Sequence, residues 1–354
     1  MGELANITSG KSVISNQSHG AYAVLGSRGI IGHDDSYDYQ GSFILIARVG
    51  AHAGHMYHYV GKVKISDNTI FLTSQMISFL YCRLLAFNLK QLSFGTGQPL
   101  IKANELKSLL LTVPPTSSEQ ERIVGFFCVL DDLIAAAKKK ADLLKLKKRY
   151  YLQAIFSQHL RFKGFTKPWQ QRKLGDVCKV SKNINKTQYS QSDVLSVSRD
   201  AGVVNQVQYQ GRSFASNDLS RYRTVTPQSL IYTKSPLKVA PYGIMISSHV
   251  HGIVSPLYAV YQCPNNYNHF LSYFFSSSAT LNNYLKPLVA KGAKNTINVS
   301  DCDAANGMVP YVNAEEVDAI VFIFQILDTL IEEVKDKHDL ICRKKAFFLQ
   351  KMFV

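Results

Sequence analysis

Residues 123–156 have the sequence IVGFFCVLDDLIAAAKKKADLLKLKKRYYLQAIF, and residues 320–353 have the related sequence IVFIFQILDTLIEEVKDKHDLICRKKAFFLQKMF. The two copies are 197 residues apart, need no gap for alignment, and are identical at 16 of 34 aligned positions. Such a repeat predicts that the chain is built as a variable domain, a repeat, a second variable domain and a second repeat.

Each copy has the spacing of a long helix with one apolar seam, because its apolar residues recur at alternating steps of four and three. The predicted seam residues are Phe127, Leu130, Ile134, Leu144 and Tyr151 in the first copy, and Phe324, Leu327, Ile331, Ile341 and Phe348 in the second. About 38 residues at roughly 1.5 Å each give a rod of about 57 Å. Near-identical seams are self-complementary, so we expect the helices to pair within the chain rather than to join two separate cores. The pattern alone does not decide between parallel and antiparallel pairing.

The sequence also predicts where the helices begin and what lies between them. Ser117 with Gln120, and Asn313 with Glu316, have the spacing of a capping box. The segments between the helices contain short strand-like runs, such as residues 43–49, 69–73, 229–233 and 257–261, and one helix each, near 75–89 and 268–285. We therefore predict an α+β protein with a first domain at 1–115, a first repeat helix at 116–162, a second domain at 163–312 and a second repeat helix at 313–354.

The composition indicates a partner of opposite charge. The chain has 354 residues, and 40 Lys and Arg against 25 Asp and Glu give a net charge of +15. No apolar run approaches the length of a membrane span, and the N-terminal residues do not resemble a secretion signal, so we expect a cytoplasmic protein. Six cysteines without any CxxC spacing indicate reduced thiols. A basic chain of this kind most often binds nucleic acid.

The known sequence motifs of catalysis are absent from the sequence. It contains no Walker A loop, no dinucleotide-binding glycine pattern, no Gly-x-Ser-x-Gly elbow and no His-Glu-x-x-His. His52, His55 and His58 are three residues apart, but they lie in a strand-and-turn context without a nearby Cys or carboxylate. We therefore expect no catalytic residues and no metal site.

Basic residues beside glycine, serine and amide side chains are the remaining candidates for function. Glycine allows the backbone to approach phosphate, Lys and Arg neutralise it, and Arg, Gln and Asn can hydrogen-bond base edges. The candidate DNA-binding residues are Ser27, Arg28, Arg48, His52, Thr96, Gln98, Arg199, Lys234, Lys291, Lys294 and Asn295.

Nearly the whole chain resembles the DNA-specificity subunit of type I restriction–modification systems. The resemblance depends most on Val113-Pro114-Pro115 with the following repeat, on the closing residues 348–353, and on Trp169 with Leu174-Gly175-Asp176. It implies two target recognition domains, held apart by an antiparallel coiled coil, that bind the two halves of a bipartite, asymmetric site on double-stranded DNA.

The same resemblance implies the partners and the cofactors. Two methyltransferase subunits and an endonuclease/translocase subunit would dock on this chain, and S-adenosylmethionine, Mg²⁺ and ATP would belong to those subunits alone. The alternative is a non-catalytic structural protein whose β domains bind protein or glycan. Steep salt dependence of binding to duplex DNA distinguishes the two.

Overall fold

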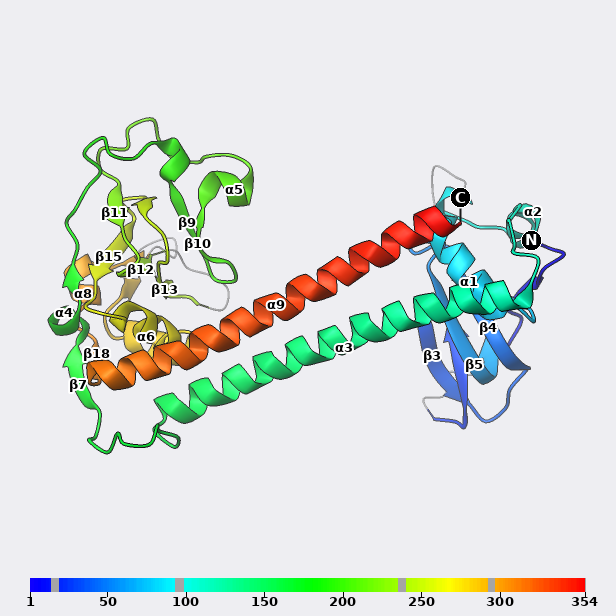
Figure 1. Ribbon diagram of the computed structural model, residues 1–354, viewed down its shortest axis with the longest axis horizontal. Helices are drawn as coiled ribbons and strands as arrows, with labels where there is room; N and C mark the ends of the chain where they lie inside the picture. Colours follow the sequence, from blue (N-terminus) through cyan, green and yellow to red (C-terminus); the bar gives the residue numbers. More distant parts are fainter. Residues whose placement is uncertain (14–18, 93–98, 235–239, 292–296, 354) are drawn as a thin grey trace. The chain divides into compact units, whose positions relative to one another are not determined.

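The computed structural model describes residues 1–13, 19–92, 99–234, 240–291 and 297–353. Its contacts divide the chain into unit 1, Met1–Ala141 with Val334–Val354, and unit 2, Asp142–Glu333. Each unit combines a sheet with helices, and two long helices, α3 (Ser117–Phe156) and α9 (Ala314–Met352), belong partly to each unit. The predicted α+β architecture with two long repeat helices is confirmed (Figure 1).

Unit 1 is organised around one six-stranded sheet with the order β1-β6-β4-β5-β2-β3. Its strands are β1 (Asn6–Ser9), β2 (Tyr22–Gly26), β3 (Gly29–Asp34), β4 (Tyr39–Ala47), β5 (Met56–Ile65) and β6 (Thr69–Thr73). Strands β2 and β5 are parallel, and the other neighbours are antiparallel. The helical segments of this part are α1 (Ile77–Ala86), η1 (Leu89–Leu92) and α2 (Ala103–Ser108).

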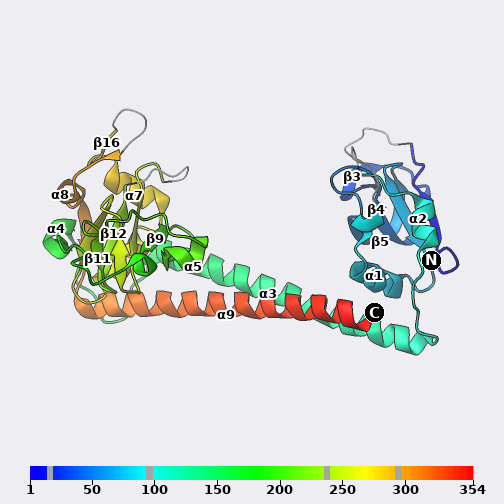
Figure 2. The same cartoon turned by 90° about the horizontal axis from the view of Figure 1, so that it is seen from above.

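Both faces of β4 are buried over residues 43–47, which explains the unbroken apolar run of this strand. Ile44 and Ile46 face a cluster that includes α1, whereas Phe43 and Leu45 pack on the opposite face with Phe71. Helix α1 also touches the long helices, because its Phe79 packs with Phe127 and Phe353 in a third cluster. Figure 2 shows α1 between the unit 1 sheet and the helix pair.

Unit 2 has a central antiparallel sheet with the order β13-β12-β15-β8 and several two-stranded ribbons. Its strands are β7 (Gln170–Lys173), β8 (Lys179–Val180), β9 (Leu195–Ser198), β10 (Gly202–Asn205), β11 (Arg223–Val225), β12 (Ser229–Thr233), β13 (Ile244–Ser247), β14 (Gly252–Val254), β15 (Tyr258–Gln262), β16 (Ala290–Lys291), β17 (Ile297–Asn298) and β18 (Met308–Tyr311). Its shorter helices are α4 (Leu174–Val177), η2 (Gln191–Asp193), α5 (Gln206–Gln210), α6 (Tyr267–Phe274), α7 (Ser278–Leu285) and α8 (Asp301–Ala304). The main core buries one face of β12 and β15 against α6, α7 and the first half of α9.

The two long helices run antiparallel, as their contacts show inside each unit. In unit 1, Lys345 of α9 pairs with Asp131 of α3, and in unit 2, Lys148 of α3 pairs with Asp328 of α9. Asp131 and Asp328 are equivalent positions of the 197-residue repeat, and so are Lys148 and Lys345. The two ion pairs are therefore equivalent. Of the ten predicted seam residues, Phe127, Phe324, Leu327 and Ile341 are buried, and Leu130, Ile134, Leu144, Tyr151, Ile331 and Phe348 are half-buried.

Three local expectations differ from the structure. At the start of α3, Thr116 Oγ1 accepts the Glu119 N–H, so the cap is one residue earlier than the predicted Ser117. At the start of α9, Asn313 Oδ1 does accept the Glu316 N–H, but the Glu316 side chain turns to Arg161 instead of closing a capping box. The single helix expected near 268–285 is divided into α6 and α7, because Ser277 caps a new helix through the Thr280 N–H.

The prediction that all cysteines are reduced is wrong for one pair. Cys178, after α4, forms a disulfide with Cys263, after β15, and both residues are buried in the main core of unit 2. The sequence gives no indication of this pair, because 85 residues separate its members and only the sheet brings them together. The other four cysteines are free thiols, of which Cys82 is buried.

Candidate nucleic-acid interface

Four of the predicted DNA-binding residues in unit 1 meet at one end of the sheet, and we call them the Arg28 cluster: Ser27, Arg28, Arg48 and His52. Arg28 Nη1 lies 3.4 Å from His52 Nε2. Ser27 Oγ donates to the Asn68 carbonyl at 3.2 Å, and Arg48 Nη1 donates to the neighbouring Asp67 carbonyl at 3.4 Å.

The Arg28 cluster has the local chemistry of a phosphate-binding surface. Gly29 ends the tight β2–β3 turn with φ of 127°, a conformation that L side chains rarely adopt, so the turn depends on glycine there. Arg28 and His52 are exposed, and within the described part of the chain neither Arg28 nor Arg48 takes part in an ion pair. Their positive charge is therefore free to act on an external anion.

The residues that follow Thr96 and Gln98 in the sequence are hydrogen-bonded to the segment around Arg48. Both residues lie outside the described residues, but the chain re-enters with Pro99, whose carbonyl accepts the Gly50 N–H at 3.0 Å. Two residues later, the Ile101 N–H donates to the Arg48 carbonyl at 2.9 Å.

The candidates of unit 2 are less uniform. Arg199 is exposed in the β9–β10 turn and donates through Nη2 to Ser278 Oγ at 2.7 Å. Lys234 instead forms an ion pair with Asp301 at 2.7 Å, and the same carboxylate pairs with Arg223 at 2.6 Å. The positive charge of Lys234 is therefore paired with a carboxylate of the same unit. Lys291 is the last residue of β16, whereas Lys294 and Asn295 lie outside the described residues.

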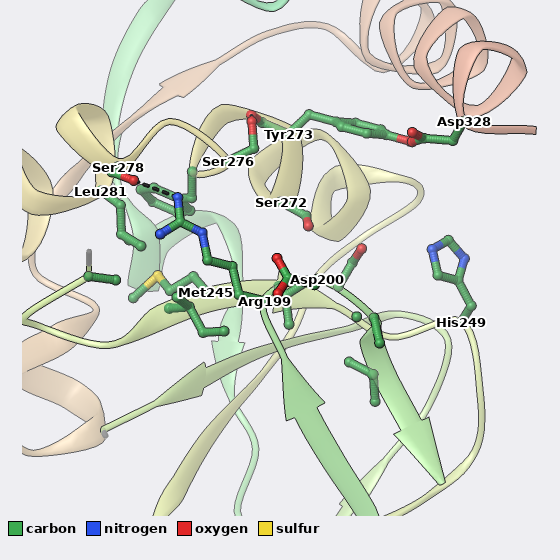
Figure 3. A pocket seen from close by; sticks show the side chains of 18 of the residues that line it. Arg199, Asp200, Met245, His249, Ser272, Tyr273, Ser276, Ser278, Leu281 and Asp328 are labelled. Carbon is green, nitrogen blue, oxygen red and sulfur yellow. Dashed lines mark hydrogen bonds between the residues drawn. The ribbon is translucent and has the colours of Figure 1, made fainter. Parts of the chain in front are cut away.

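Arg199 also lines a cavity of about 420 Å³ in unit 2, shown in Figure 3. One wall carries Asp328, which pairs with Lys148 and accepts a hydrogen bond from the Tyr273 hydroxyl at 2.9 Å. The floor includes the apolar side chains of Met245 and Leu281. The cavity thus offers charges of both signs above an apolar base, but its cations are already engaged by protein groups.

Two stacked histidines adjoin this cavity. The rings of His249 and His269 lie 4.4 Å apart, and His269 Nδ1 is 2.9 Å from Ser247 Oγ. Burial, with a smaller effect from the neighbouring His249, lowers the pKa of His269 to about 4. Burial also lowers the pKa of His249, opposed by the charge of Asp328. His269 is therefore neutral at pH 7, and the lowered pKa of His249 disfavours the charged form of that ring.

The residues that the structure describes contain neither a cluster of metal ligands nor a membrane-spanning helix. Within those residues, no three His, Cys, Asp or Glu side chains are grouped so that they could hold a metal ion. In the same residues, no helix is both long and apolar enough to span a bilayer.

One group of exposed polar residues in unit 2 is not among the predicted DNA-binding residues, namely Gln208, Tyr209, Gln210 and Arg212. They occupy α5 and the residues after it. The alternation of glutamines in Gln206-Val207-Gln208-Tyr209-Gln210, followed by Gly211, was the available signal, but a five-residue helix has too little periodicity to be predicted.

Two α+β units that share an internally duplicated, antiparallel helix pair define a two-domain protein with a pseudo-two-fold repeat. Residues 1–146 match the family described as "Type I restriction modification DNA specificity domain". A putative type I specificity subunit of Mycoplasma pneumoniae, S.MpnORF285P, is 23% identical over 137 residues, which are 36% of this chain and 45% of that protein. This chain therefore matches less than half the length of that curated relative.

A solved structure extends the similarity of fold to the whole chain. The S subunit of a type I restriction–modification system from M. genitalium has a TM-score of 0.67 at 14% identity, and the match covers 100% of this chain and 94% of that one. Residues 1–146 are thus similar to the type I restriction–modification DNA specificity domain, and the fold of the whole chain is similar to that of the solved S subunit.

Proposed function

We propose that this chain is the sequence-recognition and scaffold subunit of a type I restriction–modification complex in the cytoplasm. Its two domains, at 1–115 and 163–312, recognise the two halves of a bipartite, asymmetric site, and its helices act as a spacer. S-adenosylmethionine, Mg²⁺ and ATP belong to the partner subunits. The observation that carries the proposal is the Arg28 cluster, in which Arg28 and His52 are exposed and neither arginine forms an ion pair among the described residues, at positions within the family match.

Binding of duplex DNA by the chain together with its methyltransferase tests the proposal. We expect the affinity to fall steeply between about 50 and 200 mM salt, because each neutralised phosphate releases counterions. Replacing Arg28 and Arg48 by alanine is expected to reduce the slope of log K against log salt by about 1 for each residue lost. Fluorescence anisotropy of a labelled duplex measures both effects.

A matched control is Lys351→Ala, which removes an exposed cation from α9 at a place without a proposed phosphate contact. It should leave the salt slope unchanged. Salt-independent binding, or binding of protein or glycan in place of DNA, would reject the proposed function in favour of an interaction protein.

A second observation supports docking of two copies of one partner on the helices. Exposed apolar side chains form one group in each unit: patch 1 contains Val129, Leu133, Leu340 and Phe347, and patch 2 contains Leu143, Tyr150, Ile326 and Leu330. Each residue of patch 1 is equivalent, at an offset of 197 residues, to one residue of patch 2. Two equivalent patches suit two identical subunits.

The patches lie on the flank of the helix pair that faces away from the domains. Taking Phe127 and Phe324 as position a of the heptad, all eight residues occupy positions c and g, which share one side of an antiparallel pair. Position e lies on the other side, and there Val321 and Leu152 pack on the core of unit 2, and Val124 and Leu349 on the core of unit 1. We therefore propose that two methyltransferase subunits bind this outer flank, and that the endonuclease/translocase subunit joins the assembled complex.

Changing one aromatic residue in each patch separates the two docking sites. Phe347→Asp should reduce the complex from two methyltransferase copies to one, Tyr150→Asp should do the same, and the double variant should bind none, because a buried carboxylate without a partner disfavours each interface. Native mass spectrometry gives the stoichiometry directly. Ala135→Asp, at the exposed heptad position b of unit 1, is the control and should keep two copies. Two copies retained on the double variant would contradict the assignment.

A further inference from the structure

The part of unit 2 around α5 stands on a ribbon that is anchored in the core. Strands β9 and β10 pair from Leu195↔Asn205 to Ser198↔Gly202, and α5 follows β10 without a gap. Leu195 is buried with Ile231 and Val254 under the central sheet. Figure 1 shows the ribbon and α5 to one side of β12 and β13. The ribbon that carries α5 is therefore anchored in the core of unit 2.

Two amide side chains hold the backbone of α5 in place. Gln206 Nε2 donates to Ser196 Oγ at 3.0 Å, while its Oε1 accepts the Phe214 N–H at 2.7 Å, so one side chain ties the loop after α5 back to β9. Asn205 caps α5 by accepting the Gln208 N–H at 3.1 Å. The helix ends at Gly211, whose φ of 75° is left-handed and favours glycine.

The side chains that this rigid backbone presents are polar, exposed and available. Gln208, Tyr209, Gln210 and Arg212 are all exposed, with Tyr209 at 53%. Among the described residues, the side chains of Gln208, Tyr209 and Gln210 make no hydrogen bond, and Arg212 only stacks over the Phe214 ring at 4.6 Å. A fixed backbone carrying free hydrogen-bonding groups is the arrangement that base recognition requires.

A hollow of about 500 Å³ lies beside α5 and adds apolar contacts to the amide groups. Val203 and Val250 contribute apolar surface, and Gln208, Tyr209 and His251 line the same hollow. Glutamine can pair with the N6 and N7 edge of adenine, and an apolar side chain can contact the thymine methyl group. Residues 201–217 contain no Asp or Glu, so no carboxylate on this segment repels a phosphate backbone.

We propose that α5 with the following loop, residues 206–214, is a base-recognition element of unit 2, in which Gln208 and Gln210 select adenine–thymine pairs in one half of the DNA site. This inference rests on the proposed function, since it needs sequence-selective DNA binding by the complex. A protein partner is the competing occupant, because Tyr209 and Phe214 are exposed aromatic residues. The amide-rich, acid-free composition favours DNA.

Selection of bound duplexes from a randomised pool, followed by sequencing, tests the assignment. The chain is used at full length with its methyltransferase, as wild type, as the double variant Gln208→Ala with Gln210→Ala, and as the control Gln171→Ala. Gln171 is an exposed glutamine of β7 in the same unit. We expect the double variant to lose roughly tenfold or more of its preference for adenine–thymine at one or two positions of one half-site. The other half-site and the control should keep their preferences.

The outcomes distinguish this inference from the function on which it depends. Wild-type protein that selects no sequence at all would end the proposed function. Selective wild-type protein whose preferences are unchanged in the double variant would end only the assignment of α5. Loss of a co-purifying protein from the double variant with unchanged base preferences would assign the surface to a protein partner instead. A uniform loss of affinity at every position would show a merely structural role and would also overturn the assignment.

Discussion

Replacing Glu316 by alanine is expected to lower the free energy of unfolding of unit 2 by about 3–5 kcal/mol, the usual result of breaking a buried ion pair from one side. Glu316 is only 3% exposed, and its two carboxylate oxygens accept Arg161 Nε at 2.9 Å and Arg161 Nη2 at 2.7 Å. The Trp169 indole N–H donates to the same carboxylate at 3.1 Å. Alanine would leave the Arg161 charge and the indole N–H without an acceptor.

The chain provides its own reporter for this change. Trp169 is the only tryptophan in the sequence, and it hydrogen-bonds to the residue that is altered. Its intrinsic fluorescence during denaturant unfolding therefore follows unit 2, and its emission maximum in the native state reports the local contact. Glu315→Ala is the matched control, because Glu315 is the exposed neighbour and should change the free energy by less than about 0.5 kcal/mol.

A double-mutant cycle with Arg161→Ala measures the interaction free energy between Glu316 and Arg161, apart from the other effects of each substitution. If the two side chains act through each other, the double variant should lose clearly less stability than the sum of the two single losses. Equal losses for Glu316→Ala and Glu315→Ala, or full additivity in the cycle, would mean that the buried ion pair does not stabilise the unit.

What the sequence could predict was local or repeated. The helical periodicity follows from spacing inside 34 residues, and duplication shows it twice, so both long helices could be predicted. Strands β6 and β12 lie where they were predicted, whereas α3 ends at Phe156, before the predicted end at 162. The apolar runs of β6 and β12 are continuous because both faces of these two strands are buried. Periodicity alone was sufficient for these elements.

What the sequence could not predict depends on contacts between distant residues. Lys234 has the local features of a DNA ligand, yet it binds Asp301, 67 residues away, and nothing near Lys234 in the sequence indicates that partner. The hydrogen bonds of the Gln206 side chain could not be predicted either. They join Ser196 to Phe214 across a turn whose conformation the local sequence does not specify. Candidate residues selected by local composition therefore include groups with purely internal roles and omit others that the fold exposes.

The duplicated helices permit one experiment to be performed twice in the same molecule. Phe324 is fully buried, with its ring stacked on Phe156 at 6.4 Å and 6°. The equivalent pair in the repeat is Phe127 with Phe353, whose ring centroids are 5.8 Å apart with an interplanar angle of 18°. We expect alanine at Phe324 and at Phe127 to cost about 3–5 kcal/mol each, the range for removing a buried aromatic side chain from a core.

The two losses should differ in a direction that the packing determines. Phe324 also contacts Tyr273 at 4.9 Å and belongs to the main core of unit 2, whose many members cannot readily close around a cavity. Phe127 belongs to a small cluster beside the exposed ring of Phe126, where neighbouring side chains have more freedom to move into the space. Because the cost of a cavity rises with the volume that remains, Phe324→Ala should be the more destabilising change.

Hydrogen exchange measured by mass spectrometry can assign each loss to its own unit. Phe324→Ala should accelerate exchange in β12 and α6, and Phe127→Ala should accelerate it in α1, because those elements share the affected cores. Phe322→Ala is the control: its side chain is 64% exposed, so removal should leave exchange and unfolding nearly unchanged. If Phe322 and Phe324 proved equally sensitive, or if Phe127→Ala were neutral, the repeated seam would not be the contact that secures these helices to their cores.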